Sequence, residues 1–324
     1  MTDHILLICI IALAATFGLS AAFCAALLPF LRRLKVGQPI REEGPKEHLK
    51  KAGTPTMGGI SFILAIAVSG LVCAIVLKET RIVPVLLVAV LYAVCGFADD
   101  WMKVVRHNSD GLSAKMKLLL QLLVAAAFLV YLYMAGFAGG IRIPFTGGYI
   151  LHLPVPVYVI LFLLAVLGTD NAVNFTDGVD GLCSSITVVV ALFFGLASIR
   201  LGGGIETLCF AAAGALLGFL VFNHHPAKVF MGDTGSLALG GLVAASAVML
   251  QMHLYIIIVG FVYLAEILSV VIQVTYFKKT GGRRIFRMTP IHHHFELGGW
   301  SENKVVLVFT LTTLALCVIG WLGI

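Results

Sequence analysis

The sequence predicts an all-α integral membrane protein with about ten transmembrane helices, and three observations lead to this fold class. Hydrophobic residues make up 60% of the 324 positions. Asp, Glu, Lys and Arg make up only 12%, about half of the charged share of a soluble domain. The apolar residues also form runs of roughly 20, the length that a helix needs to cross a bilayer. A water-soluble globule, a disordered chain and a nucleic-acid-binding protein are therefore excluded.

Ten apolar segments are separated by charged or Gly/Pro-rich breaks, and each is expected to form one helix. They span approximately residues 5 to 31, 58 to 77, 82 to 98, 117 to 135, 156 to 173, 182 to 200, 206 to 222, 237 to 251, 254 to 277 and 304 to 323. Between the fourth and fifth segments, residues 136 to 155 alternate apolar side chains around a Gly-Gly pair, which predicts a β-hairpin that serves as a structural cap. No internal repeat is evident, so one polytopic domain over residues 1–324 is the simplest organisation.

The charged residues between the segments predict how the chain is oriented. The loops after the odd-numbered segments hold 18 of the 22 Lys and Arg residues, and cytoplasmic loops carry the excess of basic residues in membrane proteins. We therefore expect these loops to be cytoplasmic and both termini to lie outside. Twelve of the 16 Asp and Glu residues fall on the same side. A polar face opposite a nearly uncharged one indicates chemistry at one membrane surface more than passage through the membrane.

Asp99 and Asp100 are adjacent carboxylates at the end of the third segment, in FADDWMK. Two such groups repel each other and are costly near the bilayer core, so a cationic group is expected beside them. A Mg²⁺ site or a general base is one interpretation. The alternative is a helix end that is anchored in the lipid headgroups, with Lys103 one turn further on.

The fifth segment runs into NAVNFTDGVDGL, residues 171–182. Asn171, Asn174 and Asp177 are three residues apart and share one face if the helix continues. Asp177 and Asp180 then offer oxygen atoms to a cation or to a hydroxylated substrate. Ordinary Asn/Asp/Gly turn chemistry is the alternative. The stretch lacks Lys and Arg to neutralise its acids, which favours a cation or a donor-rich ligand.

The loop after the seventh segment reads FNHHPAKVFMGDTGSLALGG, residues 222–241. Glycines flank Asp233, so backbone amides of this loop can approach phosphate oxygens. The alternative is that Asp233, Thr234 or Ser236 caps the eighth helix. The chain has no G-x-x-x-x-G-K-[ST] sequence, and an ATP-type phosphate loop is therefore not expected.

The last polar loop contains PIHHHFE within residues 284–302. Three consecutive histidines do not match the i, i+4 pair of a helical zinc site and suit contact with an oxyanion better. The alternative is a loop that binds lipid headgroups through its arginines and aromatic residues. KKAGTPTMGG, residues 50–59, and Lys115 add further cations and hydroxyls. Glu266 is the one acid deep in a segment and is expected to be paired within the bundle, with a proton relay as the alternative.

These groups together point to phosphoryl transfer between a soluble and a lipid-borne phosphate. The stretches KKAGTPTMGG, FADDWMK, NFTDGVDGL, FMGDTGSLALGG and PIHHHFE resemble the family of phospho-N-acetylmuramoyl-pentapeptide transferases. The aspartate motifs are shared with the wider superfamily of polyprenyl-phosphate N-acetylhexosamine-1-phosphate transferases, whereas the triple histidine resembles the muramoyl-pentapeptide branch.

The resemblance implies a ten-helix, usually homodimeric enzyme of the bacterial inner membrane whose active site faces the cytoplasm. Such an enzyme moves phospho-MurNAc-pentapeptide from UDP-MurNAc-pentapeptide to undecaprenyl phosphate, forming lipid I and UMP, and it uses Mg²⁺. This is the first membrane step of peptidoglycan synthesis, and so of cell wall biogenesis. The reaction exchanges one phosphoanhydride for another, which agrees with the missing ATP motif.

The resemblance also implies roles for individual residues. Asp233 would bind Mg²⁺ on the diphosphate, and Asp99 would deprotonate or orient the lipid phosphate. The other residues expected around the reacting phosphates are Asp100, Lys115, Asn174, Asp177, His292 and His293. Those expected around the nucleoside are Lys51, Thr56, Asp180, Asn223 and Phe230, with Asp180 and Asn223 reading the uracil edge and Phe230 stacking on it. Direct attack by the lipid phosphate is preferred over a two-step route through an aspartyl-phosphate, and both fit these residues.

Two other functions compete with this interpretation. A sister transferase would use UDP-GlcNAc as its donor and share the aspartate motifs. A membrane transporter would use the aspartates as an ion-coupling site, but it predicts polar residues that run through the segments, and Glu266 with a few Asn, Gln and Ser are all that interrupt them. Both alternatives rank below the transferase.

Overall fold

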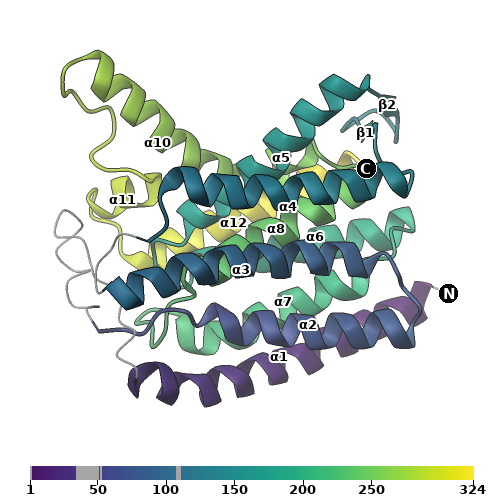
Figure 1. Ribbon diagram of the computed structural model, residues 1–324, viewed down its shortest axis with the longest axis horizontal. Coiled ribbons are helices and arrows are strands. Elements are labelled where there is room, and N and C mark those ends of the chain that lie inside the picture. Colours follow the sequence, from purple (N-terminus) through teal and green to yellow (C-terminus); the bar gives the residue numbers. More distant parts are fainter. Residues whose placement is uncertain (1, 34–50, 52, 107–110) are drawn as a thin grey trace.

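The computed structural model describes residues 2–33, 51, 53–106 and 111–324, and in these ranges the chain is almost entirely helical (Figure 1). The helices are α1 Thr2–Arg33, α2 Gly59–Val76, α3 Ile82–Arg106, α4 Ala114–Met134, α5 Val155–Thr176, α6 Leu182–Leu201, α7 Glu206–Asn223, α8 Gly232–Met249, α9 Tyr255–Val259, α10 Phe261–Lys279, α11 Ile291–Glu296 and α12 Glu302–Leu322. The two short strands are β1 Gly140–Arg142 and β2 Ile150–His152.

Most of the long helices are suited to a bilayer, which confirms the predicted all-α integral membrane fold. Within the described ranges, nine helices are long and apolar enough to cross a membrane, namely α1 to α7, α10 and α12. The tenth long helix, α8, lies in the middle of the bundle, where Asp233 is its one residue that is not fully buried. Because protein surrounds α8, its polar first turn does not meet lipid.

The largest differences from the predicted segments lie in the third, eighth and ninth segments. The third helix continues past residue 98 to Arg106, and the eighth begins at Gly232 instead of 237. Both extensions are polar turns that contacts within the protein stabilise, so hydropathy alone ends the segments too early. The ninth segment is divided into α9 and α10 at Gly260, where the backbone leaves helical geometry.

The predicted β-hairpin is present. β1 and β2 pair antiparallel with Ile141 opposite Leu151. The hairpin and both chain ends lie at one end of the bundle, and α11 lies at the other (Figure 1). The backbone amide of Arg142 donates to the carbonyl of Gln251 at 2.7 Å, and that of Phe145 to the carbonyl of Gly323 at 3.0 Å. The hairpin thus covers the ends of α8 and α12, as expected of a structural cap.

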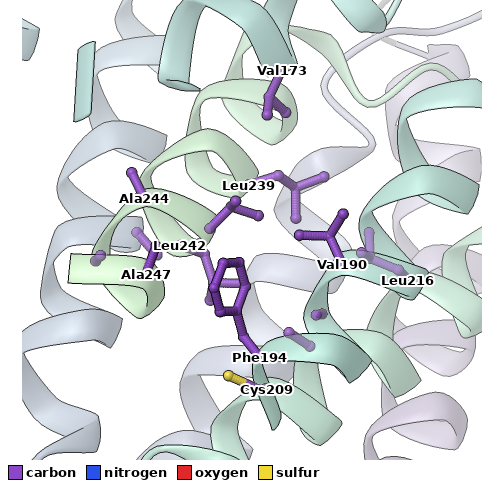
Figure 2. Packing of buried hydrophobic residues seen from close by; sticks show 14 of the residues in the cluster. Val173, Val190, Phe194, Cys209, Leu216, Leu239, Leu242, Ala244 and Ala247 are labelled. Carbon is purple, nitrogen blue, oxygen red and sulfur yellow. The ribbon is translucent and has the colours of Figure 1, made fainter. Parts of the chain in front are cut away.

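The centre of the bundle is a dry apolar core between α6, α7 and α8. Figure 2 shows the ring of Phe194 lying among Leu242, Cys209 and neighbouring aliphatic side chains. α8 contributes Leu239 and Leu242 to this core and also carries small residues such as Ala244 and Ala247, which let neighbouring helices approach closely and pack by van der Waals contact. This packing holds the N-terminal end of α8 in place among α3, α4 and α5.

Candidate active site

Four helices, α3, α4, α5 and α8, meet at the end of the bundle opposite the hairpin. Among them, α3 and α8 approach each other most closely. A Cβ atom added at Gly96 of α3 would collide with the backbone carbonyl of Asp233. Asp100, four residues further along α3, then reaches the first turn of α8. Its Oδ1 accepts from the amide of Asp233 at 3.1 Å, and its Oδ2 accepts from the amide and the hydroxyl of Thr234 at 2.8 and 2.7 Å. Asp100 therefore caps α8 from another helix.

α3 also contributes an ion pair between Asp99 and Lys103 to the site. The Lys103 ammonium lies 2.6 Å from Oδ2 of Asp99, an i, i+4 pair along the helix. The other oxygen, Oδ1, accepts from the backbone amide of Leu112 at 2.7 Å. The expected cation beside the two aspartates is thus Lys103, which the sequence had offered as a headgroup anchor.

Asp233 is the centre of the site, because polar groups from three other helices converge on it. Its Oδ2 lies 2.6 Å from the Lys103 ammonium and 3.3 Å from that of Lys117 on α4. Its Oδ1 accepts from the Asn174 amide of α5 at 2.6 Å. Asn174 also donates to the Ser236 hydroxyl at 2.7 Å. Side chains from α3, α4 and α5 therefore orient one carboxylate at the first turn of α8.

The donor set around Asp233 fits a hard divalent cation. Carboxylate oxygens of Asp99, Asp100 and Asp233 all lie within 4.8 Å of one another. Mg²⁺ prefers such oxygens and commonly uses one or two carboxylates together with substrate phosphates. Both oxygens of Asp100 accept from the first turn of α8, whereas Oδ2 of Asp99 and Oδ2 of Asp233 both face one cationic group, the Lys103 ammonium, so Asp233 and Asp99 are the better ligands. The Lys103 ammonium between them shows that this position attracts positive charge.

Asp177 follows α5 directly and adds a further carboxylate near the centre. Desolvation, together with the carboxylates of Asp233, Asp100 and Asp180, raises the pKa of Asp177 well above its ordinary range. A carboxylate held in this way gains from a cation or from a hydrogen-bond donor on a ligand. Asp177 therefore interacts with carboxylates outside its own turn, which the alternative of ordinary Asn/Asp/Gly turn chemistry does not require.

A second polar cluster lies around Asp180. The Lys51 ammonium bridges Oδ1 of Asp180 at 2.7 Å and Oε2 of Glu302 at 2.6 Å. The other Asp180 oxygen lies 3.1 Å from Nδ1 of His225 and accepts from the amide of Ala227 at 3.0 Å. Asp180, His225 and Glu302 also have the spacing of a metal site, but the Lys51 ammonium already bridges the two carboxylates. This cluster ties the loop before α2, the loop after α5 and the start of α12 together.

The other residues expected at the nucleoside differ in how accessible they are. Asn223 is buried, donates to the carbonyl of Val229 at 3.0 Å and accepts from Ser184 at 3.2 Å, so it holds the loop before α8. Phe230 is half-buried, and its backbone pairs with Pro55 and Gly58. Thr56 is buried next to the start of α8. Phe230 is thus the member of this group whose side chain is partly open to a ligand.

The three histidines of PIHHHFE lie in α11 and face different partners. Nδ1 of His292 lies 3.0 Å from Oε2 of Glu266, and both residues are fully buried. Nδ1 of His293 lies 2.7 Å from Oε2 of Glu296. Nδ1 of His294 accepts from the amide of Arg287 at 3.1 Å. The expected pairing of Glu266 is confirmed, and its partner is the first histidine.

The structure brings Lys117 to the centre in place of Lys115. Lys115 is exposed on α4, whereas Lys117 contacts both Asp233 and Asn174 at 3.3 Å. Helical periodicity places Lys117 on the inward face, since Lys117 precedes the buried Gln121 and Ala125 by one and two turns. Position 115 was preferred on the motif alone. Glu302 and His225 are further residues that the sequence interpretation left without a role, and no local pattern marks them.

Comparison with known proteins agrees with this geometry. Residues 82–251 match the model of glycosyl transferase family 4, and residues 51–63 match a signature of phospho-N-acetylmuramoyl-pentapeptide transferases. The chain is 50% identical to the phospho-N-acetylmuramoyl-pentapeptide transferase of Shouchella clausii over 98% of its length and 96% of the relative. It is 45% identical to that of Staphylococcus carnosus over 92% and 94%, and 46% identical to that of Clostridium botulinum strain Eklund 17B over 97% and 95%.

The bundle of apolar helices with a carboxylate and lysine centre at one end is thus a multi-pass membrane transferase of the glycosyl transferase 4 class. Within that class, the chain belongs to the family of phospho-N-acetylmuramoyl-pentapeptide transferases. The matched signature, residues 51–63, includes Lys51 and Thr56, and the family model covers Asp99, Asp100, Asn174 and Asp233.

Proposed function

We propose that the chain transfers phospho-MurNAc-pentapeptide from UDP-MurNAc-pentapeptide to undecaprenyl phosphate, forming lipid I and UMP. The observation that supports this most strongly is the centre at Asp233, where three carboxylates and two lysines from three helices meet at one end of a membrane bundle. A transfer between two phosphates needs positive charge for the phosphate oxygens and carboxylates for a cation. The centre contains both within a few ångströms.

The reaction makes one phosphoanhydride and breaks another. An oxygen of the lipid phosphate attacks the phosphorus that is linked to the sugar and forms a new P–O bond. The bond from that phosphorus to the bridging oxygen breaks, and the bridging oxygen leaves with the electron pair as a phosphate oxygen of UMP. Lys103 and Lys117 stabilise the negative charge that collects on the phosphates. Asp99, beside Lys103, orients the lipid phosphate and accepts its proton where one is present.

Mg²⁺ is the cofactor that the carboxylates fit best. Asp233, with Asp99 beside it, would hold the ion, which would neutralise charge on the diphosphate. Asn174 keeps the Asp233 carboxylate in a fixed orientation from α5. Asp177, whose neighbours are other carboxylates, lies where a bound cation lowers the local repulsion.

The cluster at Asp180 would form the nucleoside side of the site. Lys51 and Asp180 lie in one ion network, and Phe230 offers a partly open ring for stacking on the uracil. Asn223 and Thr56 would support the loops that carry the site and would not contact the nucleoside directly, because both side chains are buried. His292 and His293 complete the site from α11.

The orientation and the cell location are part of the same proposal. The site lies at the end of the bundle that carries most of the basic residues whose positions the structure describes, and this end would face the cytoplasm of a bacterial inner membrane. Both termini and the hairpin would then face outward. The apolar side chains exposed along α1, α4, α10 and α12 suit contact with lipid and with a second copy in a homodimer.

A donor-swap assay tests this function. Purified protein with UDP-MurNAc-pentapeptide, polyprenyl phosphate and Mg²⁺ should release UMP, and omission of the lipid or of the metal should abolish the release. UMP from UDP-GlcNAc but not from UDP-MurNAc-pentapeptide would assign the chain to the sister transferases instead. A folded sample that releases UMP from neither donor would contradict the enzyme function and favour transport.

A further inference from the structure

Glu266 and His292 form a fully buried pair at the junction of α10 and α11. Oε2 of Glu266 lies 3.0 Å from Nδ1 of His292, and the backbone amide of the same histidine donates to that oxygen at 3.4 Å. Both side chains have no exposed surface. Since the carboxylate receives two donors from one residue, the pair fixes the position and the ring orientation of His292 together.

The position of Glu266 in a membrane helix makes a packing role alone a poor explanation. A carboxylate within an apolar helix is costly and is retained where a partner or a function compensates for it. Gln273, two turns further along α10, already anchors the same segment, because its amide group exchanges hydrogen bonds with the backbone of Ile285 and Phe286 at 2.9 to 3.1 Å. The neutral side chain of Gln273 therefore already holds the segment before α11 against α10. The charge of Glu266 is not needed for that purpose and calls for another explanation.

The other nitrogen of the His292 ring faces the candidate site. A Cβ atom added at Gly178 would collide with Nε2 of His292, and Gly178 lies between Asp177 and Asp180. Among the described residues, Nε2 has no hydrogen-bond partner although it is buried. A buried ring nitrogen of this kind is costly in the absence of a partner, and a ligand in the site would provide one.

We infer that Glu266 is a positioning residue that keeps the hydrogen on Nδ1 of His292 and so presents the lone pair of Nε2, as a hydrogen-bond acceptor, to a hydroxyl or N–H group of the bound substrate. A carboxylate that accepts from one imidazole nitrogen determines which nitrogen remains for the ligand. The inference rests on the proposed function for the identity of the ligand. The pairing and the tautomer are properties of the protein alone.

Steady-state kinetics of Glu266→Leu, Glu266→Gln, His292→Gln and the double variant Glu266→Leu/His292→Gln test the inference. We expect Glu266→Leu to lower kcat about tenfold or more while KM for the sugar nucleotide stays within about threefold. Glu266→Gln, which retains a hydrogen-bond acceptor, should recover part of this loss. The double variant should be within about twofold of His292→Gln, because the two residues act as one unit. Wild-type turnover in Glu266→Leu, or losses that multiply in the double variant, would overturn the inference.

A readout that needs no turnover separates the inference from the proposed function. Nitrogen-15 NMR of histidine-labelled protein in nanodiscs, assigned with His292→Gln, should show the hydrogen on Nδ1 in the wild type and a changed tautomer distribution in Glu266→Leu. The same distribution in both proteins would overturn the positioning role. If the tautomer changes but wild-type protein releases no UMP, the proposed function fails and the pairing stands.

Glu206 offers a matched control. It is also a nearly fully buried carboxylate, it accepts from the Ser198 hydroxyl at 2.5 Å, and it lies at the hairpin end of the bundle. Glu206→Gln should leave kcat and the His292 signals unchanged. A thermal melt of each variant in detergent checks that it is folded. An equal loss of turnover in folded Glu206→Gln would show that any buried carboxylate is needed, and it would overturn the specific role of Glu266.

Discussion

Both ends of the helix bundle hold buried or partly buried carboxylates, but among the described residues the end opposite the hairpin holds more of them. At the hairpin end, the Ser198 hydroxyl donates to Glu206 at 2.5 Å and the Thr207 hydroxyl donates to Glu79 at 2.8 Å. Each carboxylate is satisfied by a hydroxyl from a neighbouring turn or helix. This arrangement stabilises helix ends.

At the other end, one carboxylate collects charged partners from several helices. Asp233 receives two lysines and an asparagine, and Asp99 and Asp100 lie beside it. Lys103 and Lys117 lie 130 and 116 residues from Asp233 in the sequence, and Asn174 lies 59 residues from it. The comparison indicates that a buried carboxylate alone does not identify a candidate site in this bundle. Several charged side chains that converge from different helices do.

Of the substitutions that test this comparison, removal of the Asp233 carboxylate should have the largest effect on turnover. We expect Asp233→Ala to lower UMP release about a thousandfold or more, because both lysines lose their common partner and the cation loses a ligand. A steady-state assay measures the loss, and a thermal melt shows whether the protein is folded. A folded Asp233→Ala protein with near-normal turnover would mean that the charge cluster is structural, like the pairs at the hairpin end.

The next largest effect is expected from the two lysines of α4, Lys115 and Lys117, of which one contacts Asp233 and the other is exposed. We expect Lys117→Met to lower kcat about a hundredfold, since its ammonium lies 3.3 Å from Asp233. Lys115→Met, two residues away on the exposed face, should lose less. A larger loss for Lys115→Met in the same assay would restore the role that the motif alone suggests for it.

A smaller effect is expected where the nucleoside would bind. Glu302→Gln weakens the network that holds Lys51 against Asp180, and we expect KM for the sugar nucleotide to rise about threefold to tenfold with little change in kcat. UMP inhibition constants measured on the same variant should rise in parallel. A fall in kcat with unchanged KM would place this cluster at the reacting phosphates instead.

The smallest effect concerns the hairpin end and stability. Partial burial and the nearby Glu206 raise the pKa of Glu79 above its ordinary 4.5, despite the hydrogen bond from Thr207. The folded state then binds this proton more tightly than the unfolded state, so stability falls as pH rises from about 4.5 through the folded pKa. Glu79→Gln should lessen this fall and melt at a slightly higher temperature than wild type at pH 7. A melt series from pH 4 to 8 that shows identical slopes would contradict it.

Hydropathy and helical periodicity were sufficient for much of the fold. Burial in lipid requires each spanning segment to satisfy its backbone internally, so long apolar runs predict helices reliably. The hairpin followed from turn chemistry. The polar ends of α3 and α8 were missed because they are stable through contacts of Lys103 and Asp100 with other groups, which no local pattern shows.

The sequence by itself determined that the chain is a helical membrane protein, because composition and periodicity are local properties, and it predicted which loops and motifs carry the chemistry. Only the tertiary structure decided that Asp100 caps α8, that Lys117 and not Lys115 contacts Asp233, and that Glu266 holds His292. Such contacts join residues that are far apart in the chain. Their geometry depends on how the helices pack, since close approaches such as that of Gly96 to α8 set which side chains meet.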